Sequence, residues 1–220
     1  EEDIEDENLV RFSEGICFDF NKIHDYSFLV GTNEGEIHSC SKSFSQDYVR
    51  SYEGHHMATY AVKWNPFHPE VFLSASADWT ISIWDHKYET AVTTFDLGTS
   101  VGDISWAPYS STVFAAVTAD GKVYLFDLSI NRHSPIGEQR IVKKGKLTHV
   151  AFNPVDPIIL VGDDRGTVMC LKLSPNLYRM TAANVQSIKP DVERERLQKF
   201  MSVTGNRARP KLSDKKPVLS

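Results

Sequence analysis

The sequence has few of the features that mark membrane proteins or secreted disulfide-rich proteins. No apolar run approaches the ~20 residues that a bilayer-spanning helix needs. The first 14 residues carry seven acidic side chains, which is the opposite of the charge of a signal peptide. The cysteines Cys17, Cys40 and Cys170 are odd in number and lie in apolar or mixed segments. They favour free thiols in a reducing compartment over a disulfide framework.

Motifs of catalysis and of metal binding are also scarce. The sequence has no phosphate-binding P-loop and no Gly-rich dinucleotide turn. His55 and His56 are adjacent rather than one helical turn apart, and the three cysteines fall in separate segments. The neighbouring carboxylates Asp163 and Asp164 follow a strand pattern, where aspartate commonly serves turn geometry. We therefore expect no enzyme, no metal site and no cofactor.

Charge of one sign is concentrated at the two ends. Residues 177–220 hold ten Lys or Arg against four acids. Phe200 is almost the only aromatic side chain among them, so a solvated basic tail is expected rather than a nucleic-acid site. Contact with a microtubule or another acidic partner is the alternative for this tail.

A short helix is expected inside the basic tail, near residues 190–203. Val192, Leu197 and Phe200 would share one face, with Arg194–Arg196 on the outside. We expect this helix to dock on the rest of the chain or on a neighbouring subunit. Phe200 is therefore a candidate partner contact.

Four segments of the sequence repeat with a period of 42–46 residues. Each unit has an aromatic anchor, at Phe20, Trp64, Trp106 and Phe152. Each also has a tight turn, at Gly35, Trp79, Gly121 and Gly166. Apolar runs and alternating segments such as Ile81-Ser82-Ile83 lie around these landmarks, and a period of two is typical of a strand with unlike faces. Each unit therefore predicts three or four short antiparallel strands.

Units of this length and content match the blades of a β-propeller, and a blade buries its faces only against its neighbours. We expect an all-β fold with four consecutive blades of a seven-bladed ring, plus a short C-terminal helix and tail. The expected blades are residues 15–54, 55–98, 99–143 and 144–176, between an acidic lead-in or inter-blade loop (1–14) and the basic tail (177–220). The fourth unit runs out of strand pattern after Leu173. This predicts an outer strand supplied by the other end of a longer protein.

The second unit resembles the WD40 family in its Gly54-His55 and Trp84-Asp85 pairs. In that family a turn aspartate orients the histidine, a serine bridges, and the indole N–H of the tryptophan is satisfied. The resemblance implies a structural tetrad of His55, Ser76, Asp78 and Trp84. The other units keep less of this signature.

Longer runs are similar to dynein intermediate chains, among them Ser76–Asp85 and Val101–Gly121. Phe28–Ile37 and Gly162–Gly166 resemble the outer-arm axonemal type. The resemblance covers roughly residues 15–180.

This resemblance implies a non-catalytic scaffold of an outer-arm axonemal dynein that supports ciliary motility. Its propeller would bind the dynein heavy-chain tail beside a second dynein intermediate chain. It would reside in the axoneme of a cilium or flagellum after cytoplasmic pre-assembly. Light chains would be contacted only through an N-terminal extension that this sequence does not contain, and neither membrane nor nucleic acid is expected as a partner. The alternative is a WD40 adaptor or scaffold of a non-dynein complex.

Three further side chains are candidate partner contacts. Trp79 occupies the turn position that the other units give to glycine. It either packs on a neighbouring loop or anchors an interface, where tryptophan is enriched. Phe67 and Tyr109 lie in loops expected on the opposite rim, and the same two interpretations apply to them.

Overall fold

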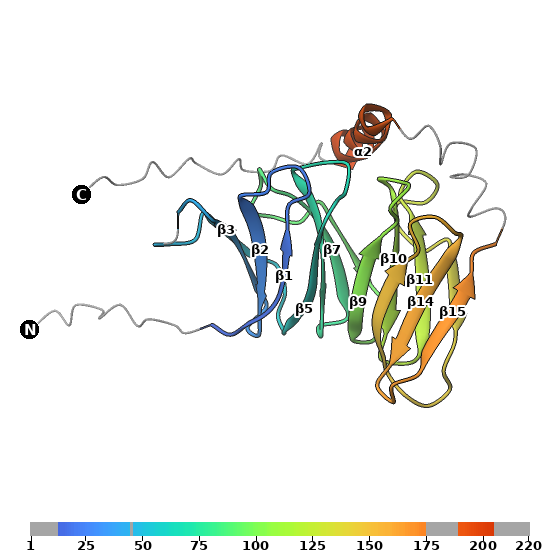
Figure 1. The fold of residues 1–220 in the computed structure, drawn as a ribbon. Coiled ribbons are helices and arrows are strands. Elements are labelled where there is room, and N and C mark those ends of the chain that lie inside the picture. Colours follow the sequence, from blue (N-terminus) through green and yellow to red (C-terminus); the bar gives the residue numbers. More distant parts are fainter. Residues whose placement is uncertain (1–12, 45, 175–188, 205–220) are drawn as a thin grey trace, which may run out of the picture.

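The fold is that of a computed structural model, which describes residues 13–44, 46–174 and 189–204 (Figure 1). These residues form four antiparallel sheets and one helix. The first sheet contains β1 (Gly15–Phe20), β2 (Ser27–Thr32), β3 (Glu36–Ser41) and β4 (Arg50–Glu53). The second contains β5 (Thr59–Trp64), β6 (Val71–Ser76), β7 (Thr80–Asp85) and β8 (Thr93–Asp96). The third contains β9 (Val101–Trp106), β10 (Val113–Thr118), β11 (Lys122–Asp127) and β12 (Gly137–Arg140). The fourth contains β13 (Leu147–Phe152), β14 (Ile158–Asp163) and β15 (Val168–Lys172).

Each sheet is a meander whose strands pair in sequence order. The first strands of successive sheets contact one another, β1 with β5, β5 with β9 and β9 with β13. Figure 1 shows the sheets side by side in the order of the sequence, as the blades of a propeller are arranged. The expected all-β, propeller-like architecture is confirmed, and we call each sheet a blade.

The two ends of the blades differ in the loops that they carry. The connection rim carries the turns 33–35, 77–79, 119–121 and 163–167 and the inter-blade loops 54–58, 97–100 and 141–146. The helix rim is the opposite end, where α2 (Pro190–Thr204) lies across the top of the blades in Figure 1.

The central strands are buried on both faces because the blades stack face to face. Every residue of β6 and of β10 is buried. The Phe72 and Trp84 rings stack in the second blade with centroids 5.8 Å apart, and Phe114 and Phe126 stack at the equivalent place in the third, 4.5 Å apart. The repeated aromatic pair shows that the sequence repeat is a repeat of packing.

The turns between second and third strands use left-handed backbone. Gly35, Gly121 and Gly166 have φ of 99°, 80° and 83°, and Trp79 has φ of 76° at the equivalent position. Trp79 is the only non-glycine residue with positive φ in the described part of the chain. Four turn positions aligned from sequence therefore share one conformation, and three of them use the residue that adopts it without strain.

The helix α2 packs on the second and third blades. Leu197 and Phe200 are 0% and 3% exposed and join the apolar core between these two blades. The expected helix is present, but its buried face differs, because Val192 is 51% exposed and Glu193 is buried. Phe200 is therefore an internal contact rather than the outside contact considered from the sequence. Among the described residues, no helix is long and apolar enough to cross a membrane.

The outward faces of the first and fourth blades carry exposed apolar side chains. Phe18 of β1 is 67% exposed and Ile16 is 44% exposed. Val168 of β15 and Leu160 of β14 are 71% and 43% exposed. Both end faces have the alternating pattern of a blade surface that packs against a neighbour.

Candidate functional site

The second blade contains a buried hydrogen-bond relay. The indole N–H of Trp84 donates to Ser74 Oγ (2.8 Å), which lies 2.6 Å from His55 Nε2. His55 Nδ1 lies 3.1 Å from Asp78 Oδ2. The network assigns the Nδ1–H tautomer to His55, with Nδ1 donating to the carboxylate and Nε2 accepting from the Ser74 hydroxyl. Four polar side chains thereby satisfy one another inside the blade.

The bridging serine is Ser74 rather than the predicted Ser76. In the β6–β7 pairing, Phe72 lies opposite Trp84 and Ser74 lies two residues further along β6. An indole reaches a neighbour two residues away, whereas Ser76 is four residues away, on the order of 13 Å along the strand. Ser76 Oγ instead donates to the Met57 carbonyl (2.9 Å) in the loop before β5.

Thr80 is a member of this network that sequence reasoning missed. Its hydroxyl donates to Asp78 Oδ1 (2.6 Å), and its backbone N–H donates to the same oxygen (3.0 Å). The backbone N–H of His56 donates to Asp78 Oδ2 (3.1 Å). The signal that could have revealed Thr80 is the Asp-x-Thr spacing, because a turn aspartate commonly bonds two residues ahead.

The protonation states suit a structural role for the relay. Burial lowers the pKa of His55, although the Asp78 carboxylate opposes this shift. Burial alone would raise the pKa of Asp78, but hydrogen bonds from Thr80 and His56 bring it below its usual value. The pair is therefore a neutral imidazole oriented by a carboxylate. Gly54 completes the fit, because a Cβ at this position would collide with the Trp84 ring.

Two motifs that can mark catalysis or metal binding have structural roles in the described residues. Gly98–Gly102 has the Gly-x-Ser-x-Gly spacing of a serine-hydrolase elbow, but it leads from β8 of the second blade into β9 of the third rather than from a strand into a helix. The carboxylate of Asp163 accepts the N–H groups of Arg165 and Thr167, and these bonds lower its pKa. No three His, Cys, Asp or Glu side chains of the described part are placed to hold a metal ion.

Trp79 is the most conspicuous side chain of the connection rim. Its side chain is about half exposed, at 52%, although its backbone lies in the left-handed turn. Its carbonyl accepts the N–H of Leu97 (3.0 Å), which ties the turn to the loop that leads into the third blade. The backbone is thus fixed while much of the indole faces solvent.

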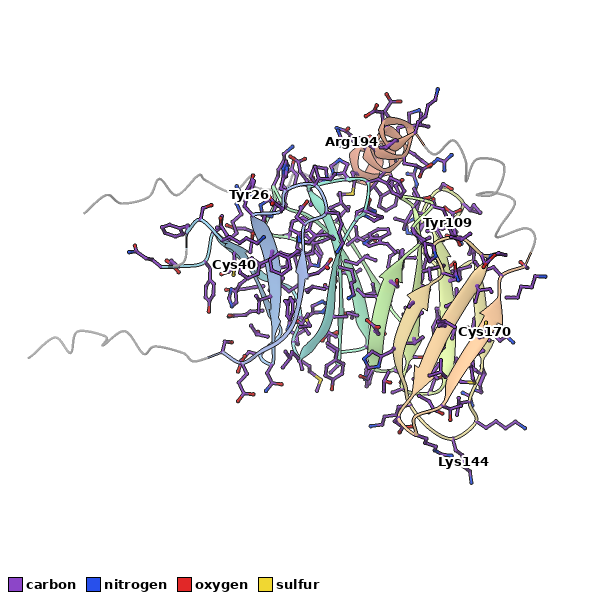
Figure 2. The ribbon with its side chains drawn as sticks, in the orientation of Figure 1. Tyr26, Cys40, Tyr109, Lys144, Cys170 and Arg194 are labelled. Carbon is purple, nitrogen blue, oxygen red and sulfur yellow. The ribbon has the colours of Figure 1, made fainter. Side chains whose placement is uncertain are left out.

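The other predicted contacts lie at the helix rim. Tyr109 is 7% exposed and packs edge-to-face on Phe152 of the fourth blade (6.0 Å), so it is an internal contact. Phe67 is half-buried, and its carbonyl lies 3.5 Å from Arg194 Nε of α2. Figure 2 shows Arg194 and Tyr109 at this end of the molecule. Of the four predicted contacts, Trp79 alone keeps a largely exposed aromatic ring.

Comparison with known proteins agrees with this description. The sequence profile "WD domain, G-beta repeat" matches residues 46–85, which include the whole relay. The fold and the relay define a WD40-repeat β-propeller protein.

Similar proteins of known family identify the kind of WD40-repeat protein more closely. "Dynein intermediate chain 2, ciliary" of Heliocidaris crassispina is 62% identical over 76% of this chain and 24% of the relative. "Dynein axonemal intermediate chain 1" of Bos taurus is 54% identical over 86% of this chain and 28% of the relative. "Dynein, 78 kDa intermediate chain, flagellar outer arm" of Chlamydomonas reinhardtii is 51% identical over 79% and 26%. The chain belongs to the axonemal dynein intermediate chain family, and it spans about a quarter of the length of these curated relatives.

Proposed function

We propose that this chain is part of a non-catalytic scaffold subunit of an outer-arm axonemal dynein. In this proposal its propeller holds the heavy-chain tail beside a second intermediate chain in the axoneme. The names of the relatives support the assignment, since they are ciliary, axonemal and flagellar outer-arm dynein intermediate chains. The relay supports the scaffold role, because its His, Ser and Asp side chains bond to one another inside the blade.

The observation that carries the choice of surface is Trp79. A non-glycine residue in left-handed backbone costs about 1–2 kcal/mol. Complete burial of the indole would offset this cost, yet 52% of the side chain is exposed. Tryptophan is enriched among interface hot spots. The connection rim is therefore the proposed binding surface for the heavy-chain tail, while α2 covers part of the helix rim.

The test is Trp79→Gly in the full-length protein. We expect the fold to persist, because the sister blades make the same turn with glycine. We expect binding to the heavy-chain tail to weaken by about 2 kcal/mol or more, which is the loss expected for a hot spot. Co-purification with the tail and a thermal melt measure the two effects separately.

The matched control is Tyr26→Ala. Tyr26 is 51% exposed, and Figure 2 places it at the end of the first blade that faces away from the connection rim. The Tyr26→Ala variant should bind the heavy-chain tail as the wild-type protein does. Unchanged binding with a lowered melting temperature for Trp79→Gly would make Trp79 a packing residue and move the proposed surface elsewhere. A wild-type protein that does not bind the tail would contradict the proposed heavy-chain contact.

A further inference from the structure

The connection rim is a continuous backbone arc. Backbone N–H···O bonds of 2.8–3.2 Å link Trp79 to loop 97–100, that loop to turn 119–121, that turn to loop 141–146, and that loop to turn 163–167. Each link joins a turn within a blade to a loop between blades. Side chains on this arc therefore stand on fixed backbone, which limits the entropy lost when a partner binds them.

One end of the arc is strongly basic. Four exposed cations gather in loop 141–146 and in the turn that bonds to it, namely Lys143, Lys144, Lys146 and Arg165. We call them the basic arc. The Asp164 N–H bonds to the Lys146 carbonyl (2.9 Å), so the two basic segments touch. Figure 2 shows Lys144 at the end of the molecule opposite to α2.

These cations differ from the paired ones beside them. Lys122 lies 2.8 Å from Glu138 and 3.5 Å from Asp120, and Arg140 lies 3.4 Å from Asp120. In the described part of the chain, no ion pair within 4 Å involves a member of the basic arc. The basic arc thus carries a net positive charge on a rigid support. Such surfaces attract acidic partners and orient them.

The opposite end of the same rim is acidic. Glu14 and Glu34 are exposed on the first blade, where the Asn33 N–H bonds to the Glu14 carbonyl (2.9 Å). Glu36 and Glu53 face each other in the β3–β4 pairing nearby. The charge along the rim therefore changes sign from the first blade to the fourth. A partner lying along the rim is favoured in one direction only.

We propose that the basic arc binds an acidic protein segment of the partner whose apolar anchor contacts Trp79. This inference rests on the proposed function, and it adds the chemistry and the direction of the bound segment. Asp163 and Asp164 are interleaved with the cations of the basic arc and repel any bound anion. A chain rich in glutamate and aspartate can place uncharged residues opposite these two carboxylates, whereas the evenly charged backbone of a nucleic acid cannot.

The experiment compares Lys144→Glu with Lys199→Glu in the full-length protein. Both replace an exposed lysine and change the net charge equally, but Lys199 belongs to α2 at the helix rim, at the opposite end of the blades from the basic arc. We expect Lys144→Glu to weaken binding of the heavy-chain tail about tenfold at low salt, and the difference should shrink as salt screens the contact. Lys199→Glu should change the affinity less than about twofold.

A second probe does not depend on the dynein assignment. A short fluorescein-labelled Glu-rich peptide should bind the wild-type protein and the Lys199→Glu variant, and it should bind the Lys144→Glu variant more weakly. Equal binding of the tail by the wild-type protein and by the Lys144→Glu variant would overturn the proposed role of the basic arc. It would leave the proposed function standing. A protein that binds the peptide but not the tail overturns the proposed heavy-chain contact and leaves the basic arc standing. If a single-stranded RNA of equal charge binds more tightly than the peptide, the ligand of the basic arc is a nucleic acid and not an acidic protein segment.

Discussion

The relay of the second blade depends on the hydroxyl of Ser74. This hydroxyl accepts a hydrogen bond from the Trp84 indole and donates one to His55. Ser74→Ala leaves both groups buried without this partner and should cost about 1–3 kcal/mol of unfolding free energy.

Trp84→Ala should cost about 3–5 kcal/mol of unfolding free energy, because the indole is fully buried and its removal leaves a cavity. Denaturant unfolding of the full-length protein measures both effects.

Ser76→Ala is the control that separates the two serines. It removes the hydroxyl bond to the Met57 carbonyl and the bond that Ser76 Oγ accepts from the Asp78 N–H. Both bonds are part-buried, whereas those of Ser74 are buried, so the change should cost about 1 kcal/mol, less than Ser74→Ala. A larger loss for Ser76→Ala than for Ser74→Ala would contradict the relay described here and return the bridge to Ser76.

At the scale of the element, the buried side chains through which α2 docks include Glu193, Leu197 and Phe200. Glu193 Oε2 accepts the Ser111 N–H (2.8 Å), while Leu197 and Phe200 enter the core between the second and third blades. Leu197→Ala should therefore weaken docking by about 2–4 kcal/mol. The exposed Val192 is the matched site, and Val192→Ala should change stability by less than about 0.5 kcal/mol.

Hydrogen exchange gives the readout, because the Ser111 amide loses its acceptor whenever α2 undocks. In Leu197→Ala this amide should exchange faster, while the amides of β10 keep their protection. Equal effects of the Leu197 and Val192 variants would restore the helix face that the sequence suggested.

Elements were more predictable than the contacts between them. Period-two alternation and turn glycines are local signals, so the strands and the turn at Trp79 could be read from the sequence. The buried face of α2 could not, because it depends on the position of Ser111, 82 residues away from Glu193 in the chain. The burial of Tyr109 depends in the same way on Phe152 in the next blade.

At the scale of the whole molecule, each blade junction combines apolar packing with a side chain that bonds to the backbone of its neighbour. Asp19 Oδ2 accepts the Trp64 N–H (2.8 Å), and Asp103 Oδ2 accepts the Val150 N–H (3.0 Å). Asn65 Nδ2 donates to the carbonyl of Ser111 (2.9 Å). Such bonds fix the position of one blade relative to the next, so the blades act as a single support for the connection rim.

The same logic predicts the behaviour of residues 1–220 expressed alone. Phe18 on the first blade and Val168 on the fourth are 67% and 71% exposed, and each belongs to a face patterned for a neighbouring blade. Exposed apolar faces at both ends favour association of one copy with the next. We therefore expect oligomers or insoluble protein, measured by light scattering after size-exclusion chromatography. Phe18→Ser should shift the distribution towards monomer, and Val203→Ser, on the outside of α2, should not. A monomeric wild-type chain with one cooperative melt would show that four blades are stable without further neighbours.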